Sequence, residues 1–325
     1  MRIATFNVDS LDHEPHAPVP LDERLPILRP QLERLRADIL CLQEVNAQHR
    51  AGQGPRELLA LDRLLEGTRY ETYERAASVP RSGAGFADVH NLVTLSRWPI
   101  VQVRSVRNTI VPPLEYRPLT AQPVSEKAEK VWFERPILLT DIAVSEGRAI
   151  TVINVHFRAP TAALIAGQKE SAHVWKSVAG WAEGYAIAAW KRAAQALETR
   201  IVVDGVLDGD ENRVVFVAGD FNAEDHETPL KIVAGAEEDT GNGLLAQRSL
   251  AVLDRTLSSD RRFSVIHHGR TMMLDHILAS RSALAFLRSF EVHNEMLADE
   301  LITYGRIRHE PGSPHAAVAA EFDLP

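Results

Sequence analysis

The chain has 325 residues, of which 45% are hydrophobic and 25% are charged, as in an ordinary soluble globular protein with a large core. Proteins that bind long stretches of nucleic-acid backbone usually carry an excess of basic residues. The formal net charge of −8 does not fit that class. That charge is compatible with a local basic patch, with a small phosphorylated substrate, or with a site that attracts cations.

Cysteine content and apolar runs bear on the compartment. The one cysteine, Cys41, cannot form an intrachain disulfide, and its hydrophobic neighbours in residues 38–42 predict a buried, inert thiol. Residues 1–5 lead into a strand without the apolar stretch of a secretory signal, and no run approaches the ~18 apolar residues of a membrane span. We therefore expect a cytoplasmic protein without a membrane span, and no obligate protein partner is evident.

The chain begins with a predicted strand, a loop and a helix. Residues 2–8 alternate as a strand, and prolines in residues 9–20 predict a loop. Leucines at helical spacing then predict a helix with Asp22 as its cap and a kink or break at Pro30. These leucines are Leu25, Leu28, Leu32 and Leu35.

Strands follow with one further helix. Residues 38–45 have the pattern of a strand, and residues 58–65 that of an amphipathic helix ended by Gly67. Over residues 69–106 the hydrophobic period shortens towards two, which predicts a strand meander. Prolines and charges over residues 108–130 predict a long surface loop, and loops of this length are commonly functional.

The middle of the chain contains the largest helical stretch. Strands are predicted at 131–144 and 149–157, before a helical insertion at about 159–200. For the aromatic side chains of this insertion, packing in the core or between helices is favoured over a cofactor site. They are Trp175, Trp181, Tyr185 and Trp190. Residues 208–212 predict a solvated charged turn, because they lack the ligand spacing of a calcium loop.

The last part of the chain alternates strands with loops. The predicted strands cover residues 214–218, 263–268, 272–279, 290–294 and 316–322. The sequence contains no internal repeat and no linker, so residues 1–325 are predicted to form a single domain.

Oxygen- and imidazole-bearing residues follow hydrophobic runs at several distant places. They occur in segments 5–7, 42–44, 153–156, 219–222, 274–277 and 313–315. Most stand at the C-terminal end of a strand-like run, so together they predict one site assembled from the rims of β-sheets. Acidic and amide oxygens with several histidines suit a hard divalent cation that works on a phosphate ester.

The segment around Asp220 illustrates the two interpretations of such a strand end. Gly219 lets the backbone leave the strand sharply and Phe221 points into the core, so Asp220 and Asn222 share the outer face. Both could then address one ligand. The alternative is an Asx turn that only closes the strand.

Three other strand ends carry polar groups. Glu44 closes a buried strand, where a carboxylate is costly unless it is paired or solvated, and a cation would serve. Asn7 ends the first strand and alone would be only a turn residue. Asn154 and His156 share one face of a strand, although a single histidine such as His156 is more often a satisfied core residue.

Asp275 and His276 are neighbours within one strand, so one of them must face inward. A buried aspartate beside a histidine from elsewhere is the usual device that fixes an imidazole tautomer, and His315 is the expected recipient. Four histidines in loops are expected to be solvated: His13, His16, His267 and His268.

Several short motifs follow one another over nearly the whole chain. They are Thr-Phe-Asn at 5–7, Leu-Gln-Glu at 42–44, Leu-Ser-Arg-Trp-Pro-Ile at 95–100, Asn-Val-His at 154–156, Gly-Asp-Phe-Asn at 219–222, Leu-Asp-His-Ile at 274–277 and Ser-Pro-His at 313–315. Together they resemble the endonuclease/exonuclease/phosphatase superfamily, or pancreatic-deoxyribonuclease-like fold. The resemblance implies an α/β (α+β) fold: a four-layer αββα sandwich of two mixed β-sheets packed face to face, with helices outside.

The resemblance also implies a metal and its ligands. Glu44 resembles the principal metal ligand, with Asn7 beside it, and the cofactor would be Mg²⁺ or Mn²⁺. Such a cation neutralises charge on a phosphate and lowers the pKa of its bound water. Asn154 would help to position the phosphate.

The same resemblance implies catalytic roles. Asp220 would align or activate the attacking water, and Asn222 would hold the phosphate. His315, oriented by Asp275, would act as a general base or an electrostatic stabiliser. His156 would sit opposite, binding a phosphoryl oxygen or protonating the leaving group.

One motif departs from the family pattern. The family usually has Ser-Asp-His where this chain has Ser313-Pro314-His315, and proline cannot bind a metal. We therefore expect weaker or differently arranged metal coordination, with help from Asp299, Glu300 or Glu310, and the second cation site is the feature most affected. The histidine at 156 favours the branch of deoxyribonuclease, sphingomyelinase and inositol-phosphatase relatives over the abasic-site repair branch.

The sequence thus predicts a divalent-metal-dependent phosphoesterase that cleaves a phosphodiester. The acidic charge favours a small nucleotide, a phospholipid head group or a sugar phosphate over processive cleavage of nucleic acid. Loops 9–22 and 108–130 and the helical segment are expected to overhang the site, with three candidate phosphate clamps: Arg81, Arg117 and Arg158. The alternative is a degenerate family member that binds a phosphorylated ligand without turnover.

Overall fold

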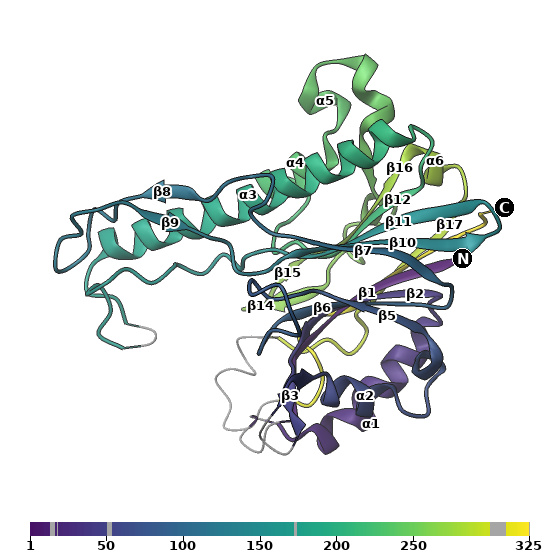
Figure 1. Ribbon diagram of the computed structural model, residues 1–325, viewed down its shortest axis with the longest axis horizontal. Coiled ribbons are helices and arrows are strands. Elements are labelled where there is room, and N and C mark those ends of the chain that lie inside the picture. Colours follow the sequence, from purple (N-terminus) through teal and green to yellow (C-terminus); the bar gives the residue numbers. More distant parts are fainter. Residues whose placement is uncertain (14–16, 18, 51–53, 172–173, 300–309, 325) are drawn as a thin grey trace.

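Two six-stranded β-sheets form the centre of the molecule (Figure 1). The computed structural model describes residues 1–13, 17, 19–50, 54–171, 174–299 and 310–324. The first sheet has the order β17 (Leu287–His293), β18 (Ala317–Phe322), β1 (Arg2–Leu11), β2 (Ile39–Val45), β6 (Asn91–Ser96) and β5 (Glu74–Ala77). The second has the order β13 (Leu250–Val252), β16 (Asp275–Ser280), β12 (Val215–Asp220), β11 (Arg148–His156), β10 (Ile137–Ser145) and β7 (Ile100–Val106).

Both sheets are mixed. β1 pairs with β2 in parallel, and β11 pairs with β12 in parallel, whereas the other neighbours are antiparallel. Parallel neighbours end at the same edge of a sheet, so each sheet brings two strand ends together there.

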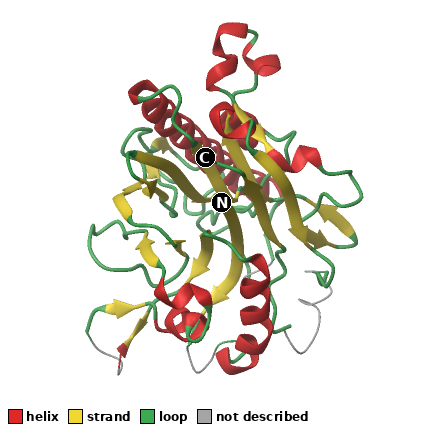
Figure 2. Ribbon diagram, turned by 90° about the vertical axis from the view of Figure 1, so that its right-hand side faces the viewer, coloured by secondary structure: helices red, strands yellow, loops and turns green. Residues whose placement is uncertain are grey.

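Helices cover the outer face of each sheet, which confirms the predicted four-layer αββα sandwich (Figures 1 and 2). Helices α1 (Leu21–Leu35) and α2 (Leu59–Leu65) pack on the first sheet, and α3 (Val178–Gly209) and α4 (Thr228–Ala234) pack on the second. Successive residues of a strand point to opposite faces. Ile3 therefore lies in the layer between the sheets, and Ala4 lies under the helices.

Short elements complete the structure. They are the strand pairs β3 (Gln48–His49) with β4 (Arg56–Glu57), β8 (Leu114–Tyr116) with β9 (Glu129–Val131) and β14 (Val265–His267) with β15 (Arg270–Met272), the helices α5 (Glu237–Thr240) and α6 (Arg281–Leu284), and the 3-10 helices η2 (Arg69–Thr72), η3 (Gly243–Arg248) and η4 (Leu253–Thr256). Within the described residues, no helix is long and apolar enough to cross a membrane.

Three predicted boundaries are corrected by the structure. Helix α1 begins after Pro20 rather than at an Asp22 cap, and it continues through Pro26 and Pro30 to Leu35. Each proline removes one N–H donor, and the buried leucines of the apolar face hold the helix against the sheet. The predicted meander is divided between the sheets: β5 and β6 belong to the first, and β7 belongs to the second.

The helical insertion also differs from the prediction. Helix α3 begins at Val178, where the Ser177 side chain accepts a hydrogen bond from the N–H of Gly180, and it continues to Gly209. Residues 208 and 209 therefore end a helix instead of opening a turn. The predicted packing of the aromatic side chains is only partly right. The Trp181 and Tyr185 rings stack with their centres 5.4 Å apart, but these residues are 44% and 40% exposed rather than buried in a core.

The predicted loop 108–130 contains a hairpin. Strands β8 and β9 pair and project with the first part of α3 beyond the two sheets (Figure 1). Tyr116 fixes the hairpin to the helix, because its ring lies 5.0 Å from that of Trp190 and its hydroxyl donates to Glu183 at 2.7 Å.

Candidate active site

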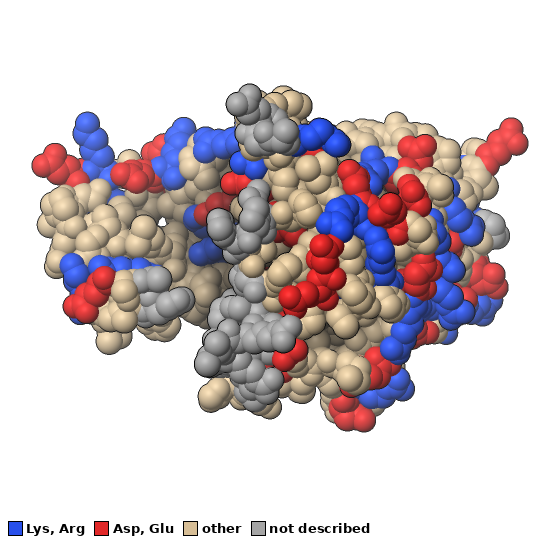
Figure 3. Space-filling model, turned by 90° about the horizontal axis from the view of Figure 1, so that it is seen from below, with Lys and Arg blue, Asp and Glu red and all other residues tan. Residues whose placement is uncertain are grey.

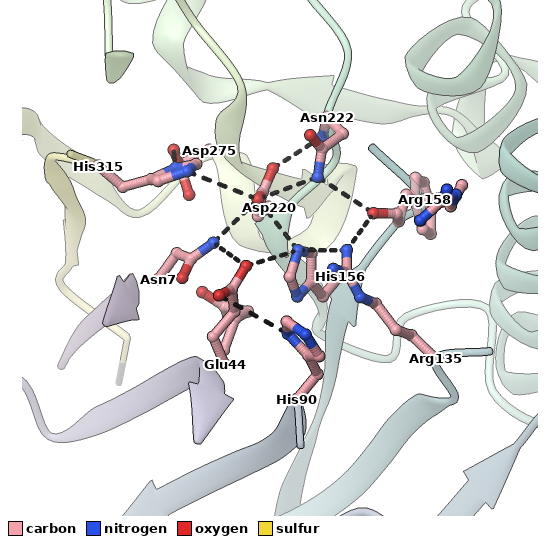
Figure 4. A network of polar contacts seen from close by, with 12 residues as sticks. Asn7, Glu44, His90, Arg135, His156, Arg158, Asp220, Asn222, Asp275 and His315 are labelled. Atoms are coloured by element: carbon pink, nitrogen blue, oxygen red, sulfur yellow. Dashed lines mark hydrogen bonds and ion pairs between the residues drawn. The ribbon is translucent and has the colours of Figure 1, made fainter. Parts of the chain in front are cut away.

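Polar side chains from both sheets meet at one edge of the sandwich (Figure 4). The Asn7 amide on β1 links the two sheets, because its Nδ2 donates to Glu44 Oε1 at 3.3 Å and to Asp220 Oδ2 at 3.1 Å. His315 Nε2 lies 4.0 Å from Asp220 Oδ2, and His156 Nε2 lies 3.3 Å from the same oxygen. The strand ends of β1, β2, β11 and β12 thus contribute to one cluster.

Unusual backbone conformations position these groups. Glu44 and Asn222 have left-handed φ values of 61° and 48°, which residues other than glycine rarely adopt. Gly219 has a φ of 149°, and a Cβ there would lie 1.9 Å from the carbonyl oxygen of Val155. The close approach of β11 to β12 therefore requires glycine at this position, next to Asp220.

The Glu44 carboxylate is held by backbone and side-chain donors. Its Oε2 accepts from Ser10 N at 3.0 Å and from Ser10 Oγ at 3.1 Å. Burial opposes its ionisation, but the neighbouring His156 and His90 rings and the Arg135 guanidinium lower the pKa of Glu44 to about 2. The group is therefore a carboxylate at neutral pH.

Asp220 is fully buried and accepts several hydrogen bonds. The Asn222 backbone N–H reaches its Oδ1 at 2.8 Å, and Asn222 Nδ2 reaches its Oδ2 at 3.1 Å. Burial raises the pKa of Asp220, but the positive charge of His315 and the donors around it outweigh burial, so that the net shift is downward. Asn222 Nδ2 also donates to the carbonyl of Phe157 at 3.1 Å, so this amide is already shared.

His315 and His156 have different partners. His315 Nδ1 lies 2.8 Å from Asp275 Oδ2. Burial opposes its charge, but Asp275 and Asp220 raise the pKa of His315 to about 10. His156 Nε2 lies 2.5 Å from Arg135 Nη1, which can only donate, so this nitrogen accepts and the ring is neutral. Burial and Arg135 lower the pKa of His156 accordingly.

The structure does not bring Asn154 to this cluster. Its amide lies in the layer between the sheets, where Oδ1 accepts from Gln43 Nε2 at 2.8 Å. Its Nδ2 donates to the carbonyls of Leu42 and Val93 at 3.2 and 3.1 Å. Asn154 therefore bridges the two sheets beneath the site.

His276 is fully buried like Asp275, and its Nδ1 lies 2.7 Å from Asp254 Oδ2.

Residues 4–299 match the sequence model of the endonuclease/exonuclease/phosphatase family. The chain belongs to this family. No curated protein sequence matches it. The family consists of phosphoester hydrolases that are typically metal-dependent.

Solved structures share the fold at low sequence identity. Truncated TDP2 from Caenorhabditis elegans aligns with a TM-score of 0.58 and 15% identity, covering 99% of this chain and 96% of that one. An AP endonuclease from Archaeoglobus fulgidus aligns with a TM-score of 0.54 and 15% identity over 100% of both chains. The 3′ phosphatase NExo from Neisseria, bound to product DNA hairpin, aligns with a TM-score of 0.51 and 19% identity over 100% of both chains.

Two groups of side chains could hold a cation in this family member. Glu44, His90 and His156 form one group, and Asp220, Asp275 and His315 form the other. In each group the donor atoms lie within 4.8 Å of one another. The donors fit a divalent metal, because carboxylate and imidazole are its common protein ligands and buried donor atoms such as His90 Nδ1 have no hydrogen-bond partner among the described residues.

Of the carboxylates expected to compensate for Pro314, Asp299 lies at the turn between β14 and β15. Asp299 accepts hydrogen bonds from the backbone of His268 and Gly269. Glu300 and His16 lie outside the described residues. His315 itself is oriented through Ser313, whose Oγ accepts from its N–H at 3.1 Å.

Two residues of the cluster were not predicted from the sequence. Arg135 donates to His156 and, at 2.9 Å, to the carbonyl of Phe157. His90 lies beside Glu44, with Nδ1 3.6 Å from Glu44 Oε2 (Figure 4). Arg135 comes from the segment before β10 and His90 from the loop before β6, and neither follows a strand end.

Three arginines were predicted to bind the phosphate. Of these, Arg158 lies beside the cluster (Figure 4), whereas the guanidinium carbon of Arg81 lies 3.5 Å from the centre of the Trp132 ring.

Proposed function

We propose that the protein is a metal-dependent phosphodiesterase that cleaves its substrate by in-line attack of a water molecule. The observation that carries the proposal is the contact between the two sheets at Asn7, which brings the Glu44 and Asp220 carboxylates to one amide. His315 lies 4.0 Å from Asp220 on the other side. A carboxylate for a metal, a carboxylate for water and a cationic imidazole are then within reach of one phosphate.

Glu44, with Asn7 beside it, would hold the divalent cation. When bound, Mg²⁺ or Mn²⁺ supplies Lewis-acid neutralisation of the phosphate charge and favours ionisation of a coordinated water. The low pKa of Glu44 suits this position, because the carboxylate needs no deprotonation before it binds a metal.

In this proposal Asp220 acts on the attacking water, and His315 acts on the phosphate. The lowered pKa of Asp220 makes it a weak base, so its carboxylate aligns the attacking water by accepting a hydrogen bond. His315 is an imidazolium at neutral pH, because its pKa is raised to about 10. It therefore stabilises negative charge on a phosphoryl oxygen rather than acting as a general base, and Asp275 holds its Nδ1 proton.

Arg135 provides a second cationic group at the cluster. Its half-buried guanidinium lies beside His156, and Nη1 also donates to the Phe157 carbonyl. A guanidinium presents several donors and matches a phosphate better than a neutral imidazole does. In this arrangement Arg135 binds a phosphoryl oxygen, and His156 orients Arg135.

A small phosphodiester or a short strand is the proposed substrate. The face shown in Figure 3 carries Lys and Arg intermingled with Asp and Glu rather than one continuous basic field. Together with the net charge of −8, this favours a small nucleotide or a phospholipid head group over long nucleic acid. Nucleic acid is the second candidate substrate, since an AP endonuclease and a DNA-bound 3′ phosphatase share the fold.

The proposal that the chain forms one domain is supported by the single layer of core between the sheets.

Hydrolysis of bis-p-nitrophenyl phosphate with Mg²⁺ or Mn²⁺ tests the proposal. Glu44→Ala removes the metal carboxylate and His315→Ala removes the cationic imidazole, so each should lower kcat/KM by about 100-fold or more. Glu126→Ala and His226→Ala, both at exposed positions, are matched controls that should retain activity.

Two other results would contradict the proposal. No turnover with any divalent metal would favour the degenerate binding protein that Pro314 suggests. Equal activity in the wild type, Glu44→Ala and His315→Ala would place the chemistry elsewhere. Plasmid nicking compared with panels of nucleotides and head groups, at one stated salt concentration, separates the substrate classes.

A further inference from the structure

The His90 side chain has a buried ring nitrogen that makes no hydrogen bond within the described part of the chain. Its Nδ1 lies 3.6 Å from Glu44 Oε2, which is too long for a hydrogen bond. The atom is inaccessible to solvent and has no hydrogen-bond partner among the described residues. Such an atom costs about 1–3 kcal/mol unless something satisfies it.

The backbone holds His90 in a strained conformation that aims the ring at Glu44. Its φ is 60°, and its N–H donates to Asn46 Oδ1 at 3.0 Å. The neighbouring Asn91 fixes the loop, because its Nδ2 donates to the carbonyls of Val45 and Ala87 at 2.9 and 2.8 Å. Strain of this kind persists where the surrounding structure enforces it, and it gathers at functional sites.

The spacing of His90 and Glu44 fits two ligands of one cation. Two donors that each lie about 2.1 Å from a metal are separated by about 3.4 Å at a tetrahedral angle. The observed 3.6 Å between Nδ1 and Oε2 is close to this value. A cation between these atoms would satisfy the buried nitrogen and the carboxylate together.

His156 does not belong to the inferred ligand set, although its Nε2 lies 3.5 Å from Glu44 Oε1. Arg135 Nη1 already occupies that nitrogen at 2.5 Å. The inference is therefore limited to His90, whose Nδ1 lies toward the Glu44 carboxylate (Figure 4).

We propose that His90 is a nitrogen ligand, through Nδ1, of the cation held by Glu44, and that this site prefers a transition-metal ion to Mg²⁺. The proposal rests on the proposed metal site at Glu44. Imidazole nitrogen suits Zn²⁺, Ni²⁺ and similar ions, whereas Mg²⁺ prefers oxygen ligands. His90 thus supplies a donor from the first sheet where Pro314 supplies none, and changes which metal is preferred.

Metal binding by the apoprotein tests this without an activity assay. Co²⁺ is the probe, measured by equilibrium dialysis and by its visible absorption spectrum, and Mg²⁺ is measured by calorimetry. His90→Ala should lower Co²⁺ affinity by at least about 10-fold, since loss of even a supporting partner of a metal ligand costs that much. The Mg²⁺ affinity should change by less than about twofold.

Further variants make the outcome decisive. His226→Ala removes a histidine whose side chain is 70% exposed and should leave Co²⁺ binding unchanged. His90→Asn keeps a residue that tolerates the left-handed backbone, so it replaces His90→Ala if the alanine variant unfolds at a lower temperature. Its Co²⁺ affinity should also fall, and its spectrum should lose the nitrogen ligand.

Two results would overturn the inference in distinguishable ways. Unchanged Co²⁺ affinity and spectrum in both His90 variants, with binding lost in Glu44→Gln, would remove His90 from the site and leave the proposed metal site intact. Unchanged Co²⁺ binding in Glu44→Gln would remove the metal site itself.

Discussion

At the scale of single residues, His315 and His156 differ in charge, because burial and Arg135 keep the His156 ring neutral, whereas Asp275 and Asp220 outweigh burial at His315. His315 Nδ1 faces the Asp275 carboxylate at 2.8 Å, whereas His156 Nε2 faces the Arg135 guanidinium at 2.5 Å. A carboxylate stabilises an imidazolium and a guanidinium stabilises a neutral ring. One histidine is therefore a cation at neutral pH and the other is not, although both follow strand-like runs in the sequence.

The charge on His315 leads to a prediction about the pH profile. An imidazolium is present below its pKa and is lost as the pH rises through about 10, so wild-type kcat/KM should fall in the alkaline range near that value. Asp275→Asn removes the carboxylate and lowers the pKa of His315 towards its ordinary value near 6.5. The alkaline limb of the profile should then move to lower pH.

Asp204→Asn is a suitable control, because Asp204 pairs with Arg200 on α3 away from the cluster. Its profile should match that of the wild type. A profile of Asp275→Asn that keeps its alkaline limb near pH 10 would show that His315 does not carry the charge that activity needs.

At the scale of secondary-structure elements, β11 and β12 approach each other so closely at the site that only glycine fits. In Gly219→Ala the new Cβ would lie 1.9 Å from the Val155 carbonyl oxygen, at a φ of 149°. We expect a loss of about 2–4 kcal/mol in the free energy of unfolding, measured by urea denaturation.

Gly205→Ala on α3 is the matched comparison, because a Cβ there meets nothing within 4 Å. Alanine in a helix interior is favoured over glycine by about 0.5–1 kcal/mol, so this variant should be unchanged or more stable. Equal stability of the two variants would mean that β11 and β12 can separate without cost.

At the scale of the whole molecule, the site depends on how the two sheets are held face to face. A polar bridge crosses the layer between them, because Asn154 on β11 binds Gln43 and the Leu42 and Val93 carbonyls of the first sheet. Asn7 and Asp220 make a second link at the edge. These contacts fix the separation of Glu44 from Asp220.

Asn154→Ala distinguishes a bridging role from phosphate binding. Loss of the amide removes one acceptor of the buried Gln43 Nε2 and the side-chain donor to two buried carbonyls, so the free energy of unfolding should fall by about 1–3 kcal/mol. KM should stay close to that of the wild type below the unfolding transition. A raised KM with unchanged stability would instead support the phosphate-positioning role implied by the family resemblance.

The sequence alone determined the fold and the chemical types of the site residues. Strand periodicity predicted most of the strands, because hydrophobic alternation records which face of each strand is buried. The αββα sandwich was implied by the family resemblance that the ordered motifs carry. Polar residues that follow buried strands, such as Asn7, Glu44 and Asp220, were recognisable because a polar group at such a place needs a partner. Helix limits and the hairpin in residues 114–131 were not recognisable, since they depend on long-range packing between the hairpin and α3.

Only the tertiary structure decided which groups face one another and which charge each carries. Arg135 and His90 belong to no strand-end motif, and they reach the cluster because a segment and a loop from different sheets meet there. Asn154 shares a strand with His156 but bonds across the layer between the sheets. A pKa depends on burial and on charges a few ångströms away in space, so the different charges of His315 and His156 could not be predicted from sequence spacing.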